Sequence, residues 1–269
     1  ADPDKATLAA QVQARGLHWG EGEARVLADG DFRLGGTTKA WSAAGKATLA
    51  RGEQTAQLDF DARGDAQHMQ VSKLLARMED GRLDASGTLA WTPALAYDFD
   101  AKLAGFDPGY FAPDWPGAVD GRANISGGHA RDGGFDTHVS LHELGGRLRE
   151  RPLSGHADIR IHDAADARAP ASYEGEVALR LGDSVVDAKG RIAQAMTVDA
   201  NFAPLQLADF LPEAGGTLRG QLHLRGARTA PDIDVDLQGT QLHYGSWSAG
   251  ALQAKGRLPW RGTAKPGEL

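Results

Sequence analysis

The fold is decided by a strict alternation in the stretch Leu95-Ala96-Tyr97-Asp98-Phe99-Asp100-Ala101-Lys102-Leu103. Apolar or small side chains occupy most odd positions, and charged side chains occupy positions 98, 100 and 102. Because successive side chains of a β-strand point to opposite faces, this period of two predicts a strand with one apolar and one water-facing side. Antiparallel sheets commonly keep one face in water, so the stretch predicts an antiparallel sheet.

The same alternation recurs along most of the chain. It runs through residues 83–91, 119–125, 153–161, 173–181, 196–202, 218–224 and 233–237. Short turns rich in Gly, Pro and Asp separate these runs, and we expect roughly sixteen strands in all. The sequence therefore predicts an all-β, mostly antiparallel fold.

Helical patterns are scarce. Val71, Leu74, Leu75 and Met78 follow the spacing i, i+3, i+4, i+7, which predicts one amphipathic helix. Weaker patterns at residues 107–112 and 207–211 predict short helical turns. Each of these three segments lies just before a glycine that opens a strand.

The composition excludes several classes of protein. The 269 residues include 35 glycines and no cysteine, and the net charge is −7. An acidic chain is unsuited to nucleic acid, and a chain without cysteine has no disulfide, thiolate zinc site or cysteine nucleophile. No run of 18 apolar residues occurs, and the polar start at residues 1–5 resembles neither a signal peptide nor an anchor. We therefore expect a fragment of a longer parent chain, ending in a loop over residues 261–269.

An internal repeat relates residues 100–127 to residues 199–226 without a gap, at an offset of 99. A looser copy begins at Gly81. The repeat predicts one elongated stack over residues 1–269, with repeat-like units of about 66–99, 100–198 and 199–269. The identical pairs are Asp100/Asp199, Ala101/Ala200, Ala104/Ala203, Phe111/Phe210, Pro113/Pro212, Gly117/Gly216, Gly121/Gly220 and Gly127/Gly226.

Two clusters have the residue types of metal ligands. His138 and His142 are four apart, as in helical zinc sites, but alternation with Val139 and Leu141 places them on the polar side of a strand. Residues 232–236 resemble half of a calcium loop, but Leu237 and His243 stand where an EF-hand needs Gly and Glu. We therefore expect no metal site and no cofactor.

No motif of a known catalytic class is present in the sequence, so we expect a protein that is not an enzyme. The basic cluster at residues 147–151 admits two interpretations. It contacts anionic head groups at the edge of a groove, or it is a solvated strand end.

Three segments carry a resemblance to a known family. They are residues 81–93 (GRLDASGTLAWTP), 106–117 (FDPGYFAPDWPG) and 216–226 (GTLRGQLHLRG), the last followed by Pro231-Asp232. In these segments the chain resembles the TamB branch of the AsmA-like proteins. The resemblance implies an elongated β-taco, a long sheet folded lengthwise around an apolar groove. It also implies a periplasmic segment of a parent chain anchored in the inner membrane.

The resemblance further implies a role in outer-membrane biogenesis. The expected function is a non-catalytic conduit that shields phospholipid acyl chains in a hydrophobic groove between the two membranes. The alternative is a structural strut that supports outer-membrane protein assembly with a TamA-type barrel, contacted through parts of the parent chain outside this segment. A third reading is a carbohydrate-active or adhesin-like β-solenoid. An amphipathic lid at residues 71–78 would fit the conduit.

The residues predicted to line the lipid groove are the large apolar members of the alternating runs. Small inward residues such as Ala85, Gly121 and Gly155 would leave voids between two closed faces, but they would leave room for acyl chains. A closed sandwich with alanine-rich filling is the alternative. The predicted groove residues are Leu83, Leu89, Trp91, Tyr97, Phe99, Leu103, Val119, Ile125, Val139, Leu141, Ile159, Ile161, Val177, Leu179, Leu181, Leu218, Leu222, Leu224, Ile233, Val235 and Leu237.

Overall fold

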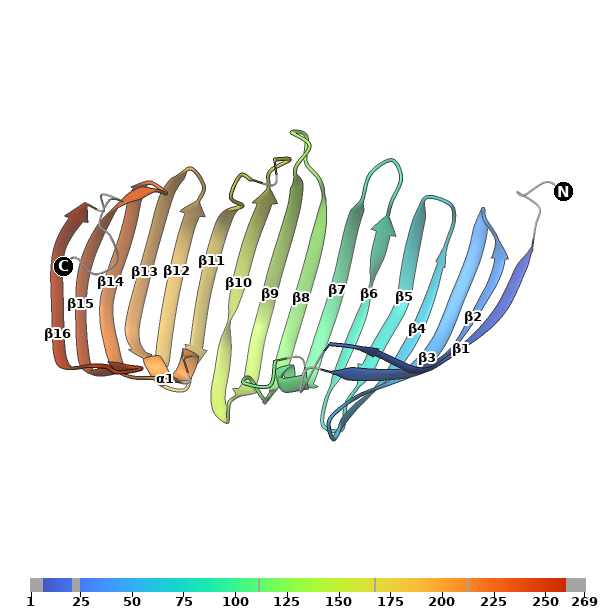
Figure 1. The fold of residues 1–269 in the computed structure, drawn as a ribbon, viewed down its shortest axis with the longest axis horizontal. Helices are drawn as coiled ribbons and strands as arrows, with labels where there is room; N and C mark the ends of the chain where they lie inside the picture. Colours follow the sequence, from blue (N-terminus) through green and yellow to red (C-terminus); the bar gives the residue numbers. More distant parts are fainter. Residues whose placement is uncertain (1–6, 21–24, 111, 167, 212, 260–269) are drawn as a thin grey trace. The chain divides into compact units, whose positions relative to one another are not determined.

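The computed structural model describes residues 7–20, 25–110, 112–166, 168–211 and 213–259; the two predicted terminal stretches lie outside these ranges. The described residues form sixteen strands that follow one another in chain order from β1 to β16 in one sheet (Figure 1). The first and last strands are not neighbours, so the sheet is not closed. The prediction of an all-β antiparallel fold of about sixteen strands is confirmed.

The chain divides into two compact units. Unit 1 comprises residues 1–129 and 141–150, and unit 2 comprises residues 130–140 and 151–269. Strand β9 (Phe135–Leu148) contributes to both units. No helix among the described residues is long and apolar enough to cross a membrane. The repeat-unit boundaries expected from the sequence stay a prediction.

Unit 1 contains the first eight strands and one short 3-10 helix, η3, and its neighbouring strands pair antiparallel. The elements are β1 (Leu8–Trp19), β2 (Val26–Thr37), β3 (Ala40–Arg51), β4 (Gln54–Gly64), β5 (His68–Arg77), β6 (Arg82–Ala90), β7 (Ala96–Phe106), η3 (Pro108–Tyr110) and β8 (Gly117–His129).

Unit 2 contains the last seven strands and one short α-helix, α1, and its neighbouring strands also pair antiparallel. The elements are β10 (Arg151–Asp163), β11 (Ser172–Leu181), β12 (Ser184–Ile192), β13 (Ala195–Gln206), α1 (Leu207–Phe210), β14 (Ala214–Ala227), β15 (Ala230–Tyr244) and β16 (Trp247–Pro259).

The helix predicted at residues 71–78 is wrong, because most of this segment belongs to strand β5. The register of β5 against β6 shifts between Val71, which faces Gly87, and Leu74, which faces Ala85. A β-bulge inserts one extra residue, so residues three apart return to the same face of the sheet. The bulge therefore produced an apolar spacing that imitates a helical turn, and the expected amphipathic lid is absent.

The two weaker helical predictions are confirmed. Helix η3 falls within residues 107–112, and α1 accounts for most of residues 207–211. Asp107 fixes the first of them, because its Oδ1 accepts hydrogen bonds from the backbone N–H of Gly109 at 2.8 Å and of Gly117 at 2.9 Å. An aspartate that accepts from the backbone two residues later forms an Asx turn, which reverses the chain locally.

The 99-residue repeat is also a repeat of strand register. In β7 and β8, the pairing shifts between Leu103, which faces Gly121, and Phe106, which faces Val119. In β13 and β14, it shifts between Phe202, which faces Gly220, and Leu205, which faces Leu218. Each of these positions is displaced by 99 residues from its counterpart. Both copies therefore carry the same bulge immediately before their short helix.

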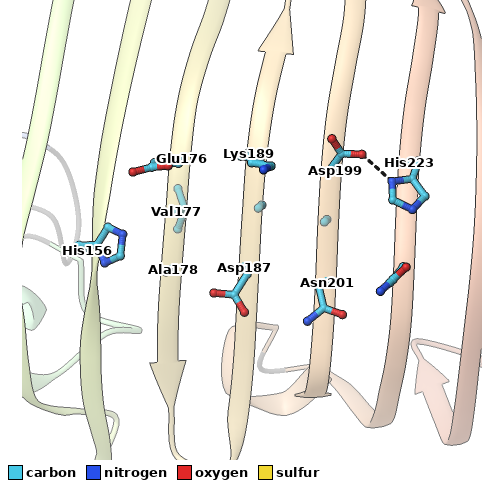
Figure 2. A pocket seen from close by; sticks show the side chains of 12 residues that line it. His156, Glu176, Val177, Ala178, Asp187, Lys189, Asp199, Asn201 and His223 are labelled. Atoms are coloured by element: carbon cyan, nitrogen blue, oxygen red, sulfur yellow. Dashed lines mark hydrogen bonds and ion pairs between the residues drawn. The ribbon is translucent and has the colours of Figure 1, made fainter.

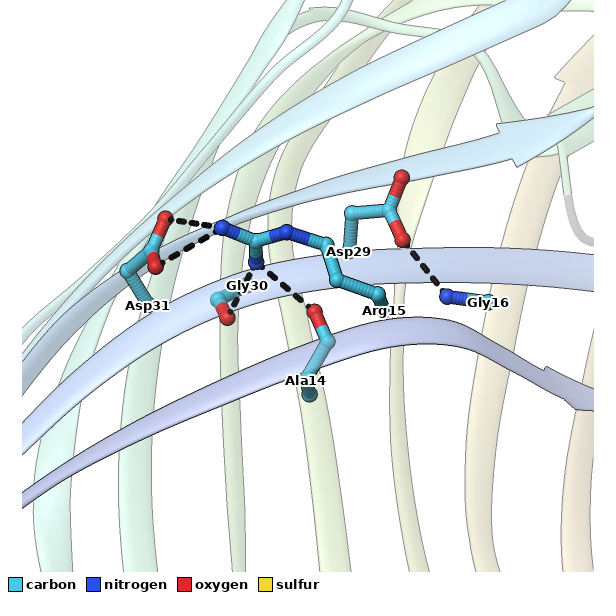
Figure 3. Close-up of polar contacts among 6 residues, drawn as sticks. All are labelled: Ala14, Arg15, Gly16, Asp29, Gly30 and Asp31. Carbon is cyan, nitrogen blue, oxygen red and sulfur yellow. Dashed lines mark hydrogen bonds and ion pairs between the residues drawn. The ribbon is translucent and has the colours of Figure 1, made fainter.

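A further bulge bends β1, and its polar contacts are drawn in Figure 3. Gly16 adopts a φ of +64°, a conformation that glycine adopts without steric cost, and its N–H donates to Asp29 Oδ1 at 2.7 Å. The Arg15 side chain donates to the carbonyl oxygen of Gly30 at 2.9 Å and to both carboxylate oxygens of Asp31. At the bulge, the backbone N–H of Gly16 and the side chain of Arg15 thus form hydrogen bonds with β2.

Candidate functional site

The apolar face of unit 1 follows directly from strand register, because residues that face one another across a ladder share a side of the sheet. Leu83 faces Leu103, and Leu89 faces Tyr97. The face continues onto β8, because Phe99 of β7 lies opposite both Gly87 and Ile125. Six of the predicted groove residues therefore lie together on one face. Phe106 and Val119 extend this face past the β7 bulge.

Unit 2 has an apolar face of the same kind. Pairings across β10 and β11 place Ile159, Ile161, Val177, Leu179 and Leu181 on one side of the sheet. Across β14 and β15 the register adds Leu218, Leu222, Leu224, Ile233, Val235 and Leu237 to that side, through their pairings with β13 and with one another. Val186 and Phe202 pair with each other and continue this face across β12 and β13. The alternation included Phe202, but the predicted groove residues left it out, and Val186 was not singled out from the sequence.

The other three predicted groove residues lie in β9 and just after β6. Val139 and Leu141 are half-buried in β9, where Val139 belongs to unit 2 and Leu141 to unit 1. Trp91 lies just beyond β6, in the turn that leads to β7. Its Nε1 donates to the carbonyl oxygen of Ala66 at 2.8 Å, which fixes the indole at the end of the face.

The apolar faces are only partly shielded from water. Most of the predicted groove residues are half-buried, Trp91 and Ile125 are exposed, and only Val119, Leu181 and Val235 are buried. A tightly closed sandwich would bury such residues almost completely, because protein interiors are close-packed. For the described residues, the apolar face is therefore a partly open surface.

Charged and amide side chains form the opposite face of unit 2. Asp199 lies 2.5 Å from His223 Nδ1, and Arg225 Nη2 donates to it at 2.6 Å; these hydrogen bonds hold the pKa of Asp199 below its ordinary value. A hollow of about 380 Å³ lies on this face. Figure 2 shows the side chains that line it, among them Asp187 and Asn201. Eight of the twelve residues that line it have polar or charged side chains.

The first candidate metal cluster includes His138, which lies on this polar face. His138 Nε2 lies 2.8 Å from Asp158 Oδ2, and Ser140 donates to the same oxygen at 3.1 Å. His138 and His142 both lie in strand β9, as the alternation predicts. In the described ranges, no group of three or more His, Asp or Glu residues is arranged to hold a metal ion.

The acidic run at residues 232–236 lies in strand β15, as predicted. Asp232 Oδ2 accepts from Arg257 at 2.8 Å, and Asp236 Oδ2 accepts from Lys255 at 2.7 Å. Cross-strand pairs of opposite charge stabilise a sheet modestly. The run is therefore a strand face whose outer two carboxylates pair with basic side chains of β16.

The basic cluster at residues 147–151 contains a tight turn. Arg149 and Glu150 adopt φ values of +50° and +63°, which is the backbone of a two-residue hairpin turn. The Arg149 guanidinium lies over the Trp115 ring, 5.5 Å from its centroid, at a distance typical of a cation–π contact. Arg147 Nη2 donates to the carbonyl oxygen of Glu150 at 2.8 Å. These contacts favour the interpretation of this cluster as a strand end.

A histidine at one end of unit 2 makes a testable electrostatic contact. His162 Nδ1 lies 2.7 Å from Asp136 Oδ1, and its Nε2 lies 3.0 Å from Asp132 Oδ2. The hydrogen bond to Asp136, together with the charge of Asp132, raises the pKa of His162 above its ordinary value. The protonated ring therefore stabilises the fold fully below about pH 6.5, and this contribution is lost as the pH rises through the folded pKa.

We expect the NMR titration of the His162 ring to have its midpoint above that of an unstructured histidine. Asp136→Asn should move this midpoint downward, because it removes the largest cause of the shift. Asp163→Asn is a matched control, since it changes a nearby exposed carboxylate on β10. A midpoint that responds equally to both variants would contradict the assignment.

The glycines on the apolar faces have a structural cause that the sequence did not reveal. A Cβ at Gly87 would overlap the carbonyl oxygen of Asp98, and one at Gly175 would overlap the carbonyl oxygen of Asp158. Glycine is the residue that allows such close approach of two backbones. These positions therefore require glycine for strand pairing, whether or not they also leave space above the sheet.

The fold and its two faces define a class of protein: an unclosed antiparallel sheet with one apolar face and one charged face. Comparison with known proteins specifies the family. The family model for the TamB N-terminal domain matches residues 2–266, and the chain belongs to this family. This assignment confirms the resemblance seen in the sequence.

A curated relative supports the same assignment. The translocation and assembly module subunit TamB of Haemophilus influenzae is 22% identical over 202 residues. This stretch covers 75% of the present chain and 15% of that protein, so the chain spans only a small part of the relative's length. No solved structure was found to match the chain.

Proposed function

We propose that this chain is a non-catalytic segment of a periplasmic lipid conduit, in which the apolar face shields phospholipid acyl chains between the inner and outer membranes. The observation that carries the proposal is the continuity of that face within each unit together with its incomplete burial. Burial of acyl chains would contribute about 0.8 kcal/mol for each CH₂ group removed from water. The phospholipid head groups would stay in water at the rim of the face.

Family membership supports a role in a translocation and assembly module, as the name of the relative states. The parent chain would be anchored in the inner membrane and would reach a TamA-type outer-membrane barrel through parts outside this segment. A strut that supports outer-membrane protein assembly is the second candidate function. Cross-strand charge pairs, such as Lys255 with Asp236, are compatible with it, because each adds a modest link between neighbouring strands.

Native mass spectrometry of the purified 269-residue chain tests the conduit. We expect adducts with the mass of phospholipids, and we expect the lipid-free chain to regain them from added vesicles. The test needs a matched variant that changes only the apolar face. Phe99→Glu places a charge on that face, whereas Asp98→Glu changes the neighbouring polar position. A lipid-free chain that takes up no phospholipid, or equal uptake by both variants, would count against the conduit and favour the strut.

A further inference from the structure

In unit 1, the sheet curls on itself at the end where β7 connects to β8. Arg51, the last residue of β3, donates from Nη1 to the carbonyl oxygen of Tyr110 in η3 at 2.6 Å. The four strands β4 to β7 lie between these residues in the sheet order. In a flat sheet, four such spacings would separate them by about 19 Å. The direct hydrogen bond therefore requires the strand ends to converge.

Side chains at this end of unit 1 are buried. Tyr110 is 2% exposed, and Val26, Ala56 and Val119 are also buried. In an antiparallel sheet, alternate connections lie at the same end of the strands. The β1–β2, β3–β4 and β7–β8 connections therefore share one end, and these buried residues lie near it. We call this the sealed end of unit 1.

The opposite end of unit 1 is open. Trp91 and Leu95, in the β6–β7 connection, are each 41% exposed. The same end holds a hollow of about 410 Å³, within the range of small-molecule sites. Leu8, Leu34 and Trp41 line it, together with glycine and threonine residues. Apolar side chains are thus exposed at this end, except near the β4–β5 connection, where Ala62 and Val71 are buried. At the sealed end, Leu17 of the first strand is 56% exposed, so the seal of unit 1 does not reach β1.

Unit 2 has the same asymmetry. Near α1, the buried Asp209 carboxylate accepts a hydrogen bond from Ser184 Oγ at 2.5 Å and forms an ion pair with Arg151, which joins α1 to β12 and β10. Leu181, at this end of β11, is 1% exposed, whereas Tyr173, at the other end of the same strand, is 41% exposed. The end near α1 is therefore the sealed end of unit 2.

Two features define the limits of this seal. Tyr244 and Trp247, in the β15–β16 connection, are exposed, so the seal of unit 2 does not reach the last two strands. At the open end, Arg228 Nη1 donates to the carbonyl oxygen of Ala171 at 2.7 Å. A lipid could displace this hydrogen bond, whereas opening the sealed end would leave the Asp209 charge buried without its partners.

We propose that acyl chains enter and leave each unit sideways across its open end, and that η3 and α1 with their buried contacts close the other end. This inference rests on the proposed conduit function and adds the side from which the conduit loads. In unit 2, entry across the open end would break the Arg228–Ala171 hydrogen bond but would leave no charge buried without a partner. Entry across the sealed end would require the contacts of Tyr110 or Asp209 to break.

The chain has no cysteine, so introduced cysteines can be labelled uniquely. Leu95→Cys with Tyr173→Cys places a bulky sulfonated maleimide at both open ends. Asp114→Cys with Leu211→Cys places the same label beside η3 and α1, and all four positions are exposed. The measurement is the rate at which pyrene-labelled phosphatidylcholine moves from unilamellar vesicles to the full 269-residue chain. Each labelled chain is compared with its unlabelled form.

We expect labels at the open ends to slow uptake by about tenfold, and labels beside η3 and α1 to leave it nearly unchanged. Uptake that is slowed equally by both label pairs, or by neither, would overturn the inference; the second result would indicate loading at the sheet edges β1 and β16. If the unlabelled chains take up no lipid, the conduit function itself fails. Circular dichroism of each labelled chain shows whether the sheet is retained.

Discussion

Replacing Leu222 with arginine is expected to lower the rate of phospholipid transfer between vesicles by at least about tenfold. Leu222 is half-buried in the middle of β14, where it faces Ala200 on one side and Val235 on the other. A guanidinium at this position would have to lose its water when an acyl chain passes over it. Because desolvating an unpaired charge is costly, the arginine raises the barrier to movement along the face.

The neighbouring residue provides a matched control for this variant. Gln221 is exposed on the polar face, where it faces Asn201 and Asp236, so Gln221→Arg adds the same charge on the other side of the strand. It should leave transfer within about twofold of the unchanged chain. Leu222→Ala separates loss of packing from gain of charge, and it should also retain transfer. If Leu222→Arg and Gln221→Arg are both folded and transfer lipid at equal rates, the proposed conduit function is contradicted.

Gly220→Ala is expected to reduce the free energy of unfolding by about 3 kcal/mol. Gly220 has a φ of +125°, which side-chain-bearing residues rarely adopt, and an added Cβ would overlap the carbonyl oxygen of Asp236. It also faces Phe202 at the bulge of β13, so the strand has little freedom to move away. The midpoint of urea unfolding measures the loss.

Two other glycines calibrate this expected loss. Gly121 occupies the same place in the repeat, but a Cβ there would lie 3.4 Å from the carbonyl oxygen of His142, an ordinary contact. Gly121→Ala should therefore cost less than Gly220→Ala. Gly250 in β16 has open space around it, so Gly250→Ala should change stability by no more than about 0.5 kcal/mol. Equal losses at all three positions would show that glycine entropy, rather than overlap, determines the effect.

The strands and their two faces were predictable because alternation is a local property of the chain. The alternation around Leu83 and around Tyr97 places both side chains on the apolar face, and the cross-strand pairs confirm this placement. The predicted helix at residues 71–78 was wrong because a bulge changes the periodicity without leaving a distinctive residue type. The repeat alignment predicted equivalent positions, and the shared register shift of β7 and β13 gives those positions a structural meaning.

The sequence by itself determined that this chain is an antiparallel sheet with one apolar and one charged side, since side-chain periodicity dictates both. Family resemblance was also visible there, in three segments of strands and breakers. Only the tertiary structure decided which end of the apolar face is covered. That outcome depends on contacts such as Arg51 with Tyr110 and Arg151 with Asp209, which join residues 59 and 58 positions apart. Such contacts arise from the curl of the paired strands, which no local pattern of residues encodes.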